Sequence, residues 1–556
     1  MTQPSVRSGV PAPRTGGAGS GLVRAVRRSP EPVGTGRAPI PAIHRLTERR
    51  LAAAEVVVIA SGPYPGPDAV AVAREISNRL DGERPGRVLV LAHTPSRTHE
   101  ALLATEEVTV PIPAHWAGPL LRGWAARGLD RPSAQDELGD LRVQLDGSFG
   151  LGALAACGVG IATGHVSLLS RGRLALETPG PAAESHVLSP QRIVVATGSA
   201  PLVPDVPGIL ETTWYTAADL FELPALPSSA VIVGAGSHGC EVAQGLARLG
   251  ITVTLVDSAE RPLPHLPEAA AEPVIRSLAA DGVRMICGAP LAKVAPTLDD
   301  GAWVGTDGGG DVAAEALVLA TGRRPRTTGL DLTAGGVVVG PRGMIEVDER
   351  LRTASGVMAC GEVTGLSTYG AAPGPMARVV AATVVGRRSG MRWASPWPAL
   401  VTRTDPEVAV LGHAEPHQGE VMAESPGPHP GSSVRVVVGT NGGRGLFGAL
   451  GALGGGSGRV VTGAVLVGPG AGEAVSQLVL AVNAGIPAAS LLDLEAPDRT
   501  WAASVQAGVA RALAGGCERL GRVSAEALRA GRDPPAGHRN RCPSRARHRR
   551  TAPAGG

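Results

Sequence analysis

The pattern of apolar and polar residues is clearest between residues 231 and 257, in the stretch VIVGAGSHGCEVAQGLARLGITVTLVD. An apolar run leads into Gly234, and a β-branched run later ends at Asp257. Between them an apolar face recurs at helical spacing, at Val242, Leu246 and Leu249. Short apolar runs are typical of buried strands, and spacings of three to four residues are typical of a helix. The stretch therefore predicts a strand, a tight turn, a helix and a second strand, which together form a βαβ unit.

The turn of this unit has the spacing G-x-G-x-x-G, at Gly234, Gly236 and Gly239. The first glycine permits the turn, the second lets the backbone approach a pyrophosphate, and the third lets the helix pack on the strand. The helix N-terminus favours phosphate charge, and Asp257 can accept hydrogen bonds from both ribose hydroxyls. We predict dinucleotide binding here; the alternative is a βαβ turn with a purely structural role.

A second pattern of this kind lies near the beginning of the chain, with a strand at 56–59, a helix from residue 68 and a strand at 87–91. This unit departs from the dinucleotide-binding pattern. Ala60 stands at the first glycine position, Pro65 looks inserted, and the second strand ends in Ala92–His93 instead of an acidic residue. On its own it fits nucleotide binding and a structural βαβ unit equally well.

The remaining patterns predict a mixed α/β protein, although residues 111–150 show no clear periodicity. Two segments, RIVVATGSAP at 192–201 and ALVLATGRRP at 316–325, repeat a buried strand that runs into a small-residue turn. We expect helices at 95–107, 151–160, 267–281 and 473–484, a long helix ending at Gly386, strands at 164–176, 283–286 and 460–467, and a small antiparallel layer at 290–316.

Composition changes this picture mainly at the two ends. The chain has 556 residues, a net charge of +3 and a single lysine, Lys293. Residues 1–50 and 514–556 each carry +7, which leaves −11 for the body between them. The tails lack aromatic residues among their arginines, so we expect solvated disorder and no nucleic-acid or membrane partner.

The cysteines and the apolar runs point to a cytoplasmic protein. The six cysteines show no C-x-x-C spacing, no signal peptide is evident, and no run reaches the length of a membrane span.

Together, the two βαβ units, the two A-T-G turns and a late G-E segment resemble the flavoprotein pyridine nucleotide–disulfide oxidoreductases, in the branch of dihydrolipoamide dehydrogenase and mercuric reductase. The resemblance covers residues 52–513. Its further motifs are ATGSAP at 196–201, ATGRRP at 320–325, LRTASGVMACGEVTG at 351–365, TDPEVAVLG at 404–412 and GAVLVGPGAGEAVSQLVLAVNAG at 463–485.

The resemblance implies two Rossmann-like domains and a C-terminal α+β dimerisation domain. The expected ranges are 51–208 with 324–392 for the FAD-binding domain, 209–323 for the NAD(P)-binding domain and 393–513 for the dimerisation domain. We also expect a homodimer, because the strand at 460–467 and an apolar helix face offer more apolar surface than a small domain can hide. That helix face consists of Val475, Leu478, Val479 and Val482.

The same resemblance assigns cofactors and residues. FAD would be held by Gly62, Gly66, Arg97, Thr197, Gly198, Ser199, Gly361 and Glu362. NAD(H) or NADP(H) would be held by Gly234, Gly236, Gly239, Glu241, Asp257 and Gly322. Arg97 would pair with Glu241 near the flavin, or both would be independent surface charges. Asp257 would repel a 2′-phosphate and so favours NADH, while Arg261 keeps NADPH open.

The departures from the family decide the expected chemistry. The strand ending at Leu91 runs directly into HTPSR, as though the segment with the redox cysteines were missing, and without two thiols no dithiol–disulfide relay operates. The family's catalytic His–Glu pair falls at Asp498 and Ala503, so no residue is assigned as catalytic. Cys240 could have a lowered thiol pKa at the start of its helix or be a packed core residue, as we expect for Cys360.

Two functions remain. The preferred one is an FAD-dependent NAD(P)H oxidoreductase that passes electrons from flavin directly to a small, quinone-like acceptor. The other is a catalytically silent, NAD-binding relative with a binding or regulatory role. The departures at Ala60, Pro65 and Ala92–His93, and Glu362 in place of the family's aspartate, all fall on the flavin side, while the NAD side is intact.

Overall fold

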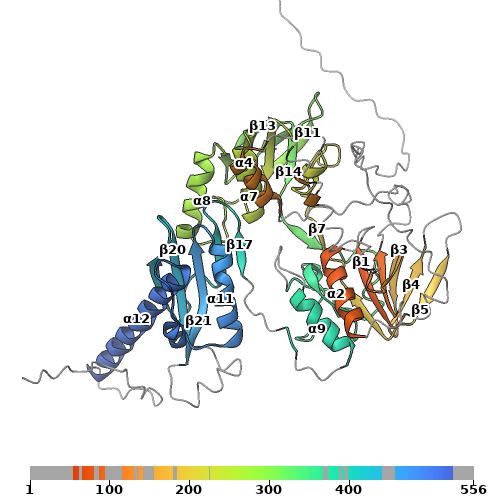
Figure 1. Ribbon diagram of the computed structural model, residues 1–556. Helices are drawn as coiled ribbons and strands as arrows, with labels where there is room; N and C mark the ends of the chain where they lie inside the picture. The colour runs from red at the N-terminus through yellow and green to blue at the C-terminus, as the bar shows by residue number, and fades with distance from the viewer. Residues whose placement is uncertain are drawn as a thin grey trace, which may run out of the picture.

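The computed structural model describes residues 54–61, 66–80, 87–93, 116–129, 157–178, 184–223, 226–366, 374–386, 391–393, 399–440 and 458–529, with a few positions between 133 and 156. They form three units, which we call the first, second and C-terminal units, and each is built around one main sheet (Figure 1).

The first unit has a seven-stranded sheet in the order β16-β6-β1-β2-β3-β4-β5, in which neighbours from β16 to β3 are parallel and the last two pairings are antiparallel. Its strands are β1 (Val56–Ser61), β2 (Val88–His93), β3 (Gly160–Leu169), β4 (Arg173–Glu177), β5 (Ser185–Leu188), β6 (Arg192–Val195) and β16 (Met358–Ala359). The helices α2 (Gly66–Arg79) and α9 (Gly374–Val384) lie side by side on one face (Figure 1).

Alternation along β1 explains this layering. Val56 and Val58 pack with the helices, whereas Val57 and Ile59 pack on the opposite face with the antiparallel strands and residues 330–345. Because successive strand side chains point to opposite faces, the apolar run VVVI supplies both cores at once. The expected strand at 56–59 is therefore confirmed as a strand buried on both faces.

The second unit has a parallel four-stranded sheet in the order β10-β9-β8-β14. Its strands are β8 (Ser229–Val233), β9 (Thr252–Val256), β10 (Arg284–Ile286) and β14 (Ala316–Leu319), and its helices are α7 (Ser237–Arg248) and α8 (Glu268–Ala280). The expected antiparallel layer is confirmed as β11 (Leu291–Pro296), β12 (Ala302–Thr306) and β13 (Gly310–Ala314), which covers the sheet face opposite to the helices.

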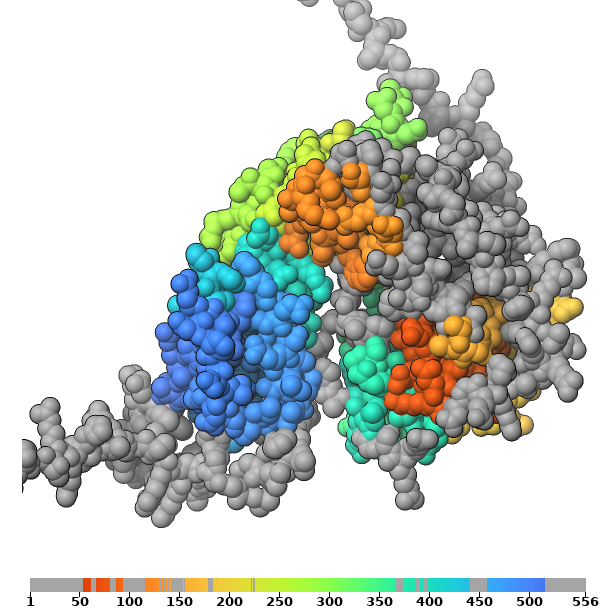
Figure 2. Space-filling view, in the orientation of Figure 1, coloured from red at the N-terminus to blue at the C-terminus, as the bar shows by residue number. Residues whose placement is uncertain are grey.

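The stretch 111–150, which showed no clear pattern, contains the helix α4 (Ala117–Arg127). This helix lies within the range expected for the FAD-binding domain, yet it packs on α7 of the second unit, away from β1 and α2 (Figure 2). The close approach depends on Gly118, where a Cβ atom would lie 2.5 Å from the Cβ of Glu241. This part of the range expected for the FAD-binding domain therefore packs on the second unit.

The C-terminal unit has an antiparallel sheet in the order β17-β18-β21-β20-β19. Its strands are β17 (Leu400–Thr402), β18 (Val408–Gly412), β19 (Val421–Pro426), β20 (Ser433–Thr440) and β21 (Arg459–Val467), and its helices are α11 (Ala471–Ala484) and α12 (Trp501–Arg529). Both helices pack on one face, and Val408, Val465 and Val467 on the other face join the core of the second unit.

Two expectations for this unit need correction. Val475 and Leu478, part of the helix face expected to be left for a partner, are buried against the unit's own sheet, and Val479 and Val482 pack on the same core. The second tail was expected to be disordered from residue 514, but α12 continues to Arg529, in agreement with the high helix propensity of its Ala, Leu, Arg and Glu residues.

Other expectations fall partly outside the described residues. The expected helix at 95–107, most of the one at 151–160 and the tail 1–50 lie there, and β3 already begins at Gly160. The helices expected at 267–281 and 473–484 are confirmed as α8 and α11. Within the described part of the chain, no helix is long and apolar enough to cross a membrane.

Candidate functional site

The glycine turn after β8 is shaped by two close backbone contacts and one open space. Gly234 has φ +107° and a Cβ there would lie 2.4 Å from the carbonyl oxygen of Ala320; a Cβ on Gly239 would lie 1.8 Å from the oxygen of Gly234. A Cβ on Gly236 would meet nothing within 4 Å. The space beside Gly236, at the N-terminus of α7, therefore fits the close approach of a pyrophosphate.

Asp257 lies at the end of β9, beside this turn. Its carboxylate accepts hydrogen bonds from the backbone N–H of Ala235, within the turn, and from that of Ala259 at 2.8 Å. Each carboxylate oxygen has more than one lone pair, so both can also accept a ribose hydroxyl. Arg261 donates three hydrogen bonds to the carbonyls of residues 262, 263 and 266, and these bonds hold its guanidinium against the backbone.

The two A-T-G turns are joined by reciprocal hydrogen bonds, in which each turn contacts the strand that follows the other turn. β7 (Ser199–Pro201) pairs with β15 (Arg323–Pro325) as an antiparallel ribbon between the first and second units. Gly198 accepts from the N–H of Arg326, and Gly322 accepts from the N–H of Leu202. The hydroxyls of the preceding threonines, Thr197 and Thr321, donate to the carbonyls of these two partners, 326 and 202.

Both turns lie at switch points of a parallel sheet. Thr197 and Gly198 follow β6, which neighbours β1 on the side away from β2, and Gly322 follows β14, which neighbours β8 on the side away from β9. Dinucleotides bind at such points in open α/β sheets. Gly198 (φ +63°) and Gly322 (φ +112°) both have open space where a Cβ would lie.

The ribbon also orders the edge of the first unit. Arg323 donates to the Ser199 hydroxyl at 2.6 Å and to its carbonyl at 2.9 Å, and it lies 3.4 Å from the Glu362 carboxylate. The Ser199 hydroxyl in turn donates to Glu362. Two of the residues assigned to flavin, Ser199 and Glu362, are thus brought together by the residue that follows the other A-T-G turn.

Asp68, in the first turn of α2, is a member of this edge that the sequence analysis missed. Its carboxylate accepts a 3.3 Å hydrogen bond from the backbone N–H of Glu362, and a Cβ on Gly361 would lie 2.0 Å from its Oδ2. Burial and the nearby Glu362 carboxylate raise the pKa of Asp68 from 3.8 to about 6. An acidic residue two positions after the glycine turn was the signal in the sequence.

His93 ends β2, at the place where dinucleotide-binding units carry an acidic residue. It is buried, and its Nδ1 accepts from the N–H of Val166 at 3.1 Å, so Nε2 carries the proton and faces the Thr328 carbonyl at 3.3 Å. Burial is the main cause that lowers the pKa of His93 to about 4. The imidazole is therefore neutral near pH 7 and its two nitrogens are occupied by backbone groups.

Four further assigned residues lie as follows. Glu241 is buried; it accepts a 2.6 Å hydrogen bond from the N–H of Arg403 in the C-terminal unit and lies 3.8 Å from Nδ1 of His238 in the coenzyme turn. Gly66 is the first residue of α2. Gly62 and Arg97 lie outside the described residues, and with them any Arg97–Glu241 pair. Asp498 is exposed, as expected for a surface residue.

Three of the cysteines have thiols that are harder to ionise than a free cysteine. Burial raises the thiol pKa of Cys240, Cys287 and Cys360, so the lowered pKa considered for Cys240 is wrong. Cys360 is 1% exposed and belongs to the core of the first unit, as expected. Desolvation of the thiolate outweighs the benefit of the helix N-terminus at Cys240.

The two edges differ in how well their residues fit a dinucleotide. On the coenzyme side, the open space at Gly236 and the carboxylate of Asp257 fit NAD(H). On the flavin side, the open space at Gly198 fits a close approach, whereas the Asp68 and Glu362 carboxylates oppose an anionic pyrophosphate.

Comparisons with known proteins agree with this architecture. Residues 156–386 match the family model of pyridine nucleotide-disulphide oxidoreductases. Mercuric reductase from Acidithiobacillus ferrooxidans is 30% identical over 312 residues, which cover 54% of each protein. The enzyme of the same name from Bacillus cereus is 30% identical over 335 residues, which cover 58% of this chain and 51% of that protein. The chain thus spans about half the length of these relatives.

Solved structures extend the likeness in fold to more of the chain. The flavoprotein disulfide reductase RclA from Escherichia coli superposes with a TM-score of 0.65 at 20% identity, and LpdA from Mycobacterium tuberculosis with 0.63 at 22%. Each comparison covers 82% of this chain and 99% of the other. With two parallel α/β units and a C-terminal α+β unit, the chain shares the fold of these flavoproteins, and its residues 156–386 are similar to the pyridine nucleotide-disulphide oxidoreductases.

Proposed function

We propose that this protein is an FAD-dependent NAD(P)H oxidoreductase that prefers NADH and passes electrons from flavin directly to a small, quinone-like acceptor. The observation that carries the proposal is the ribbon β7–β15, which ties the coenzyme edge to the flavin edge. Arg323 in this ribbon follows the A-T-G turn at Gly322, which is assigned to the coenzyme, and it contacts Ser199 and Glu362, which are assigned to the flavin. The ribbon thus holds the turns at Gly198 and Gly322 next to each other, each with open space beside its glycine. This arrangement suits two dinucleotides whose nicotinamide and flavin rings have to come into contact.

In this proposal the residues bind and orient, while the cofactors carry the chemistry. The turn from Gly234 to Gly239 and the N-terminus of α7 hold the coenzyme pyrophosphate, and Asp257 accepts from the adenosine ribose. The Thr197–Gly198 turn and the Gly361–Glu362 segment face the flavin. When bound, the flavin takes a hydride from the nicotinamide and delivers the electrons to the acceptor.

The preference for NADH rests on the two charged residues at the ribose end. Asp257 presents a carboxylate to the diol and repels a 2′-phosphate. Arg261 is bound to three backbone carbonyls, and leaving them for a phosphate would cost these charge-assisted hydrogen bonds.

Direct transfer without a protein disulfide is part of the proposal. Cys240 and Cys360 are buried, their thiol pKa values are raised, and all four cysteines whose side chains the structure describes are free thiols. The segment that follows β2, where the family's redox pair belongs, lies outside the described residues, and its lack of cysteines is read from the sequence.

We also propose a homodimer formed through the C-terminal unit, as is typical of the family. Three exposed apolar residues of the C-terminal unit support a dimer: Leu480, Leu492 and Leu494 are 68%, 40% and 56% exposed. Light scattering of the purified protein tests this, and a monodisperse monomer would contradict it.

The second candidate, a silent NAD-binding relative, is favoured by one specific observation. Asp68 lies on the first turn of α2, the helix whose N-terminus would face the flavin pyrophosphate. Its carboxylate accepts a hydrogen bond from the backbone N–H of Glu362. A negative charge there disfavours the anion that a helix N-terminus otherwise attracts.

The absorbance spectrum of the purified protein separates the two candidates. A flavoprotein shows flavin absorbance that anaerobic NADH bleaches and that a quinone then restores. A colourless protein that binds NAD⁺, but takes up no FAD on reconstitution, would support the silent relative instead.

A further inference from the structure

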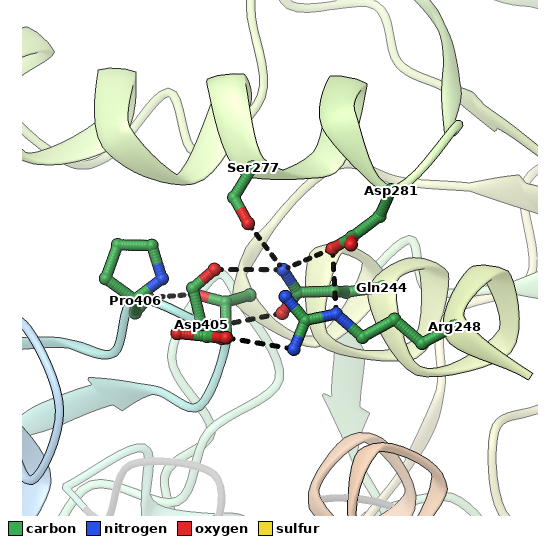
Figure 3. A network of polar contacts seen from close by, with 7 residues as sticks. Gln244, Arg248, Ser277, Asp281, Asp405 and Pro406 are labelled. Carbon is green, nitrogen blue, oxygen red and sulfur yellow. Dashed lines mark hydrogen bonds and ion pairs between the residues drawn. The ribbon is translucent and has the colours of Figure 1, made fainter. Parts of the chain in front are cut away.

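Helix α7 has a polar face that lies against the C-terminal unit. Its members recur at spacings of four, three and four residues, which places them along one side of a helix: Ser237, Glu241, Gln244 and Arg248. This side faces residues 402–405, where the chain leaves β17 in the C-terminal unit; Figure 3 shows the part around Gln244, Arg248 and Asp405. We call these contacts the α7 seam.

The seam begins at the coenzyme turn. Ser237 directly follows Gly236, and its hydroxyl lies 2.6 Å from the hydroxyl of Thr402 and 3.1 Å from Nε2 of His265. Thr402 is only 1% exposed, so it can influence a bound coenzyme only through Ser237. One turn further along, Glu241 accepts the backbone N–H of Arg403.

Gln244 forms the centre of the seam and is fully buried. Its Oε1 accepts the N–H of Asp405 at 2.7 Å, and its Nε2 donates to the carbonyl of the same residue at 3.0 Å, as a neighbouring strand would (Figure 3). The Nε2 also lies 3.1 Å from Ser277 Oγ and 3.0 Å from Asp281 Oδ2 of α8 and its C-cap.

Arg248 closes the seam at its far end. Its guanidinium bridges Asp281 at 2.9 Å and Asp405 at 3.0 Å (Figure 3). Beside the polar contacts, Val408, Val465 and Val467 of the C-terminal sheet share the apolar core of the second unit. The C-terminal unit therefore fixes α7 along its length, from the phosphate end to the last turn.

We propose that the segment 402–405 is a positioning element for coenzyme binding: docking of the C-terminal unit sets the tilt of α7 and so the aim of its N-terminal amides at the coenzyme pyrophosphate. This inference rests on the proposed function in that the turn 234–239 must bind NAD(H). Coupling of two binding equilibria is reciprocal, so the coenzyme in turn stabilises the docked C-terminal unit.

The test measures NAD⁺ affinity of the full chain by calorimetry for two variants that leave the glycine turn untouched. Thr402→Val removes one hydroxyl from the C-terminal side of the seam, and Gln244→Met removes the buried amide at similar volume. We expect NAD⁺ to bind about threefold more weakly to the first and on the order of tenfold more weakly to the second. Thr353→Val is the matched control, because Thr353 is also a buried threonine bonded to a backbone carbonyl, but in the first unit; its NAD⁺ affinity should equal that of the parent.

Hydrogen exchange of the backbone amides supplies the reciprocal measurement. NAD⁺ should slow the exchange of the Arg403 and Asp405 amides in the parent and in Thr353→Val, and less so in Thr402→Val. If the parent binds NAD⁺ and both seam variants bind it equally well, the positioning role is wrong while the proposed function stands. If the parent binds no NAD⁺, both are wrong. Should Gln244→Met fail to fold, Thr402→Val decides alone, since it removes a single hydroxyl.

Discussion

The carboxylate of Asp68 decides how readily the first unit accepts an anion. It is half-buried next to a second carboxylate, Glu362, and accepts a 3.3 Å hydrogen bond from the backbone N–H of Glu362. Desolvation and like charge both favour the protonated form. The Asp68 side chain, which fills the space beside Gly361, therefore titrates near pH 6.

This titration predicts a pH-dependent stability. Because the pKa is raised on folding, from 3.8 to about 6, the folded state gains from protonation; that gain is complete below about pH 4 and is lost as the pH rises through 6. A shift of about two units corresponds to about 3 kcal/mol. Asp68→Asn should therefore raise the melting temperature of the apoprotein at pH 7.5 and leave it almost unchanged at pH 4.

The control for Asp68→Asn is Glu75→Gln, which neutralises an acid on the same helix whose partner is Arg79 at the surface. It should show no such gain at pH 7.5. An equal gain for Asp68→Asn at both pH values would rule out titration as the cause. The Asn variant should also take up FAD more tightly at pH 7.5, as measured by quenching of flavin fluorescence.

Asp257 carries the prediction on coenzyme choice. Asp257→Ala removes the acceptor of the ribose hydroxyls and the anchor of the Ala235 and Ala259 amides, and hydrogen bonds to a charged group contribute about 1.5–3 kcal/mol. We expect NAD⁺ to bind at least tenfold more weakly, with a smaller loss for NADP⁺, because only NAD⁺ presents both hydroxyls. Asp311→Ala, an exposed acid on β13, is the control. An unchanged ratio of the two dissociation constants would remove Asp257 from the site.

At the scale of elements, helix α4 contains a matched pair of glycines, Gly118 and Gly123, that test its packing on α7. A Cβ at Gly118 would meet Glu241 at 2.5 Å, whereas a Cβ at Gly123 would meet nothing within 4 Å. Overpacking costs about 1–3 kcal/mol, and Ala in place of an exposed helical Gly gains up to about 1 kcal/mol. Gly118→Ala should thus lower the denaturation midpoint and Gly123→Ala raise it slightly. Equal effects of the two substitutions would show that α4 does not pack on α7 through Gly118.

The sequence predicts α7 well on one side and poorly on the other. Val242 and Leu246 are buried as their spacing indicates. Polar residues on the remaining side look like a solvated face, yet Glu241 and Gln244 are buried because the chain returns 160 residues later to cover them. Such partners depend on tertiary contacts, so local periodicity carries no information about them.

The same limit explains the other differences. α4 contacts α7 through Gly118 and Leu121, which lie against Glu241 and Gly245, and these partners are distant in the sequence. Asp68 and His93 have roles that depend on segments distant in sequence, Glu362 and residues 166 and 328. By contrast, the glycine spacing at 234–239 could be interpreted directly, because its requirements are local backbone geometry.

At the scale of the whole molecule, the units form one continuous body through two joints, the ribbon β7–β15 and the α7 seam. The ribbon connects flavin edge and coenzyme edge, and the seam connects the coenzyme edge with the C-terminal unit. Neither joint contains a cysteine.

The last prediction is that turnover is independent of every cysteine. Cys240 and Cys360 are fully enclosed, so alanine is the suitable replacement there, because a serine would bury an additional polar group. A variant with alanine at these two positions and serine at the other four should keep NADH oxidation by a quinone within a few-fold of the parent, provided that it folds and binds flavin. Anaerobic titration should need one NADH per flavin, and not two, since no dithiol stores a second electron pair. Loss of turnover in a folded, flavin-loaded variant, or a requirement for two equivalents in the parent, would contradict direct transfer.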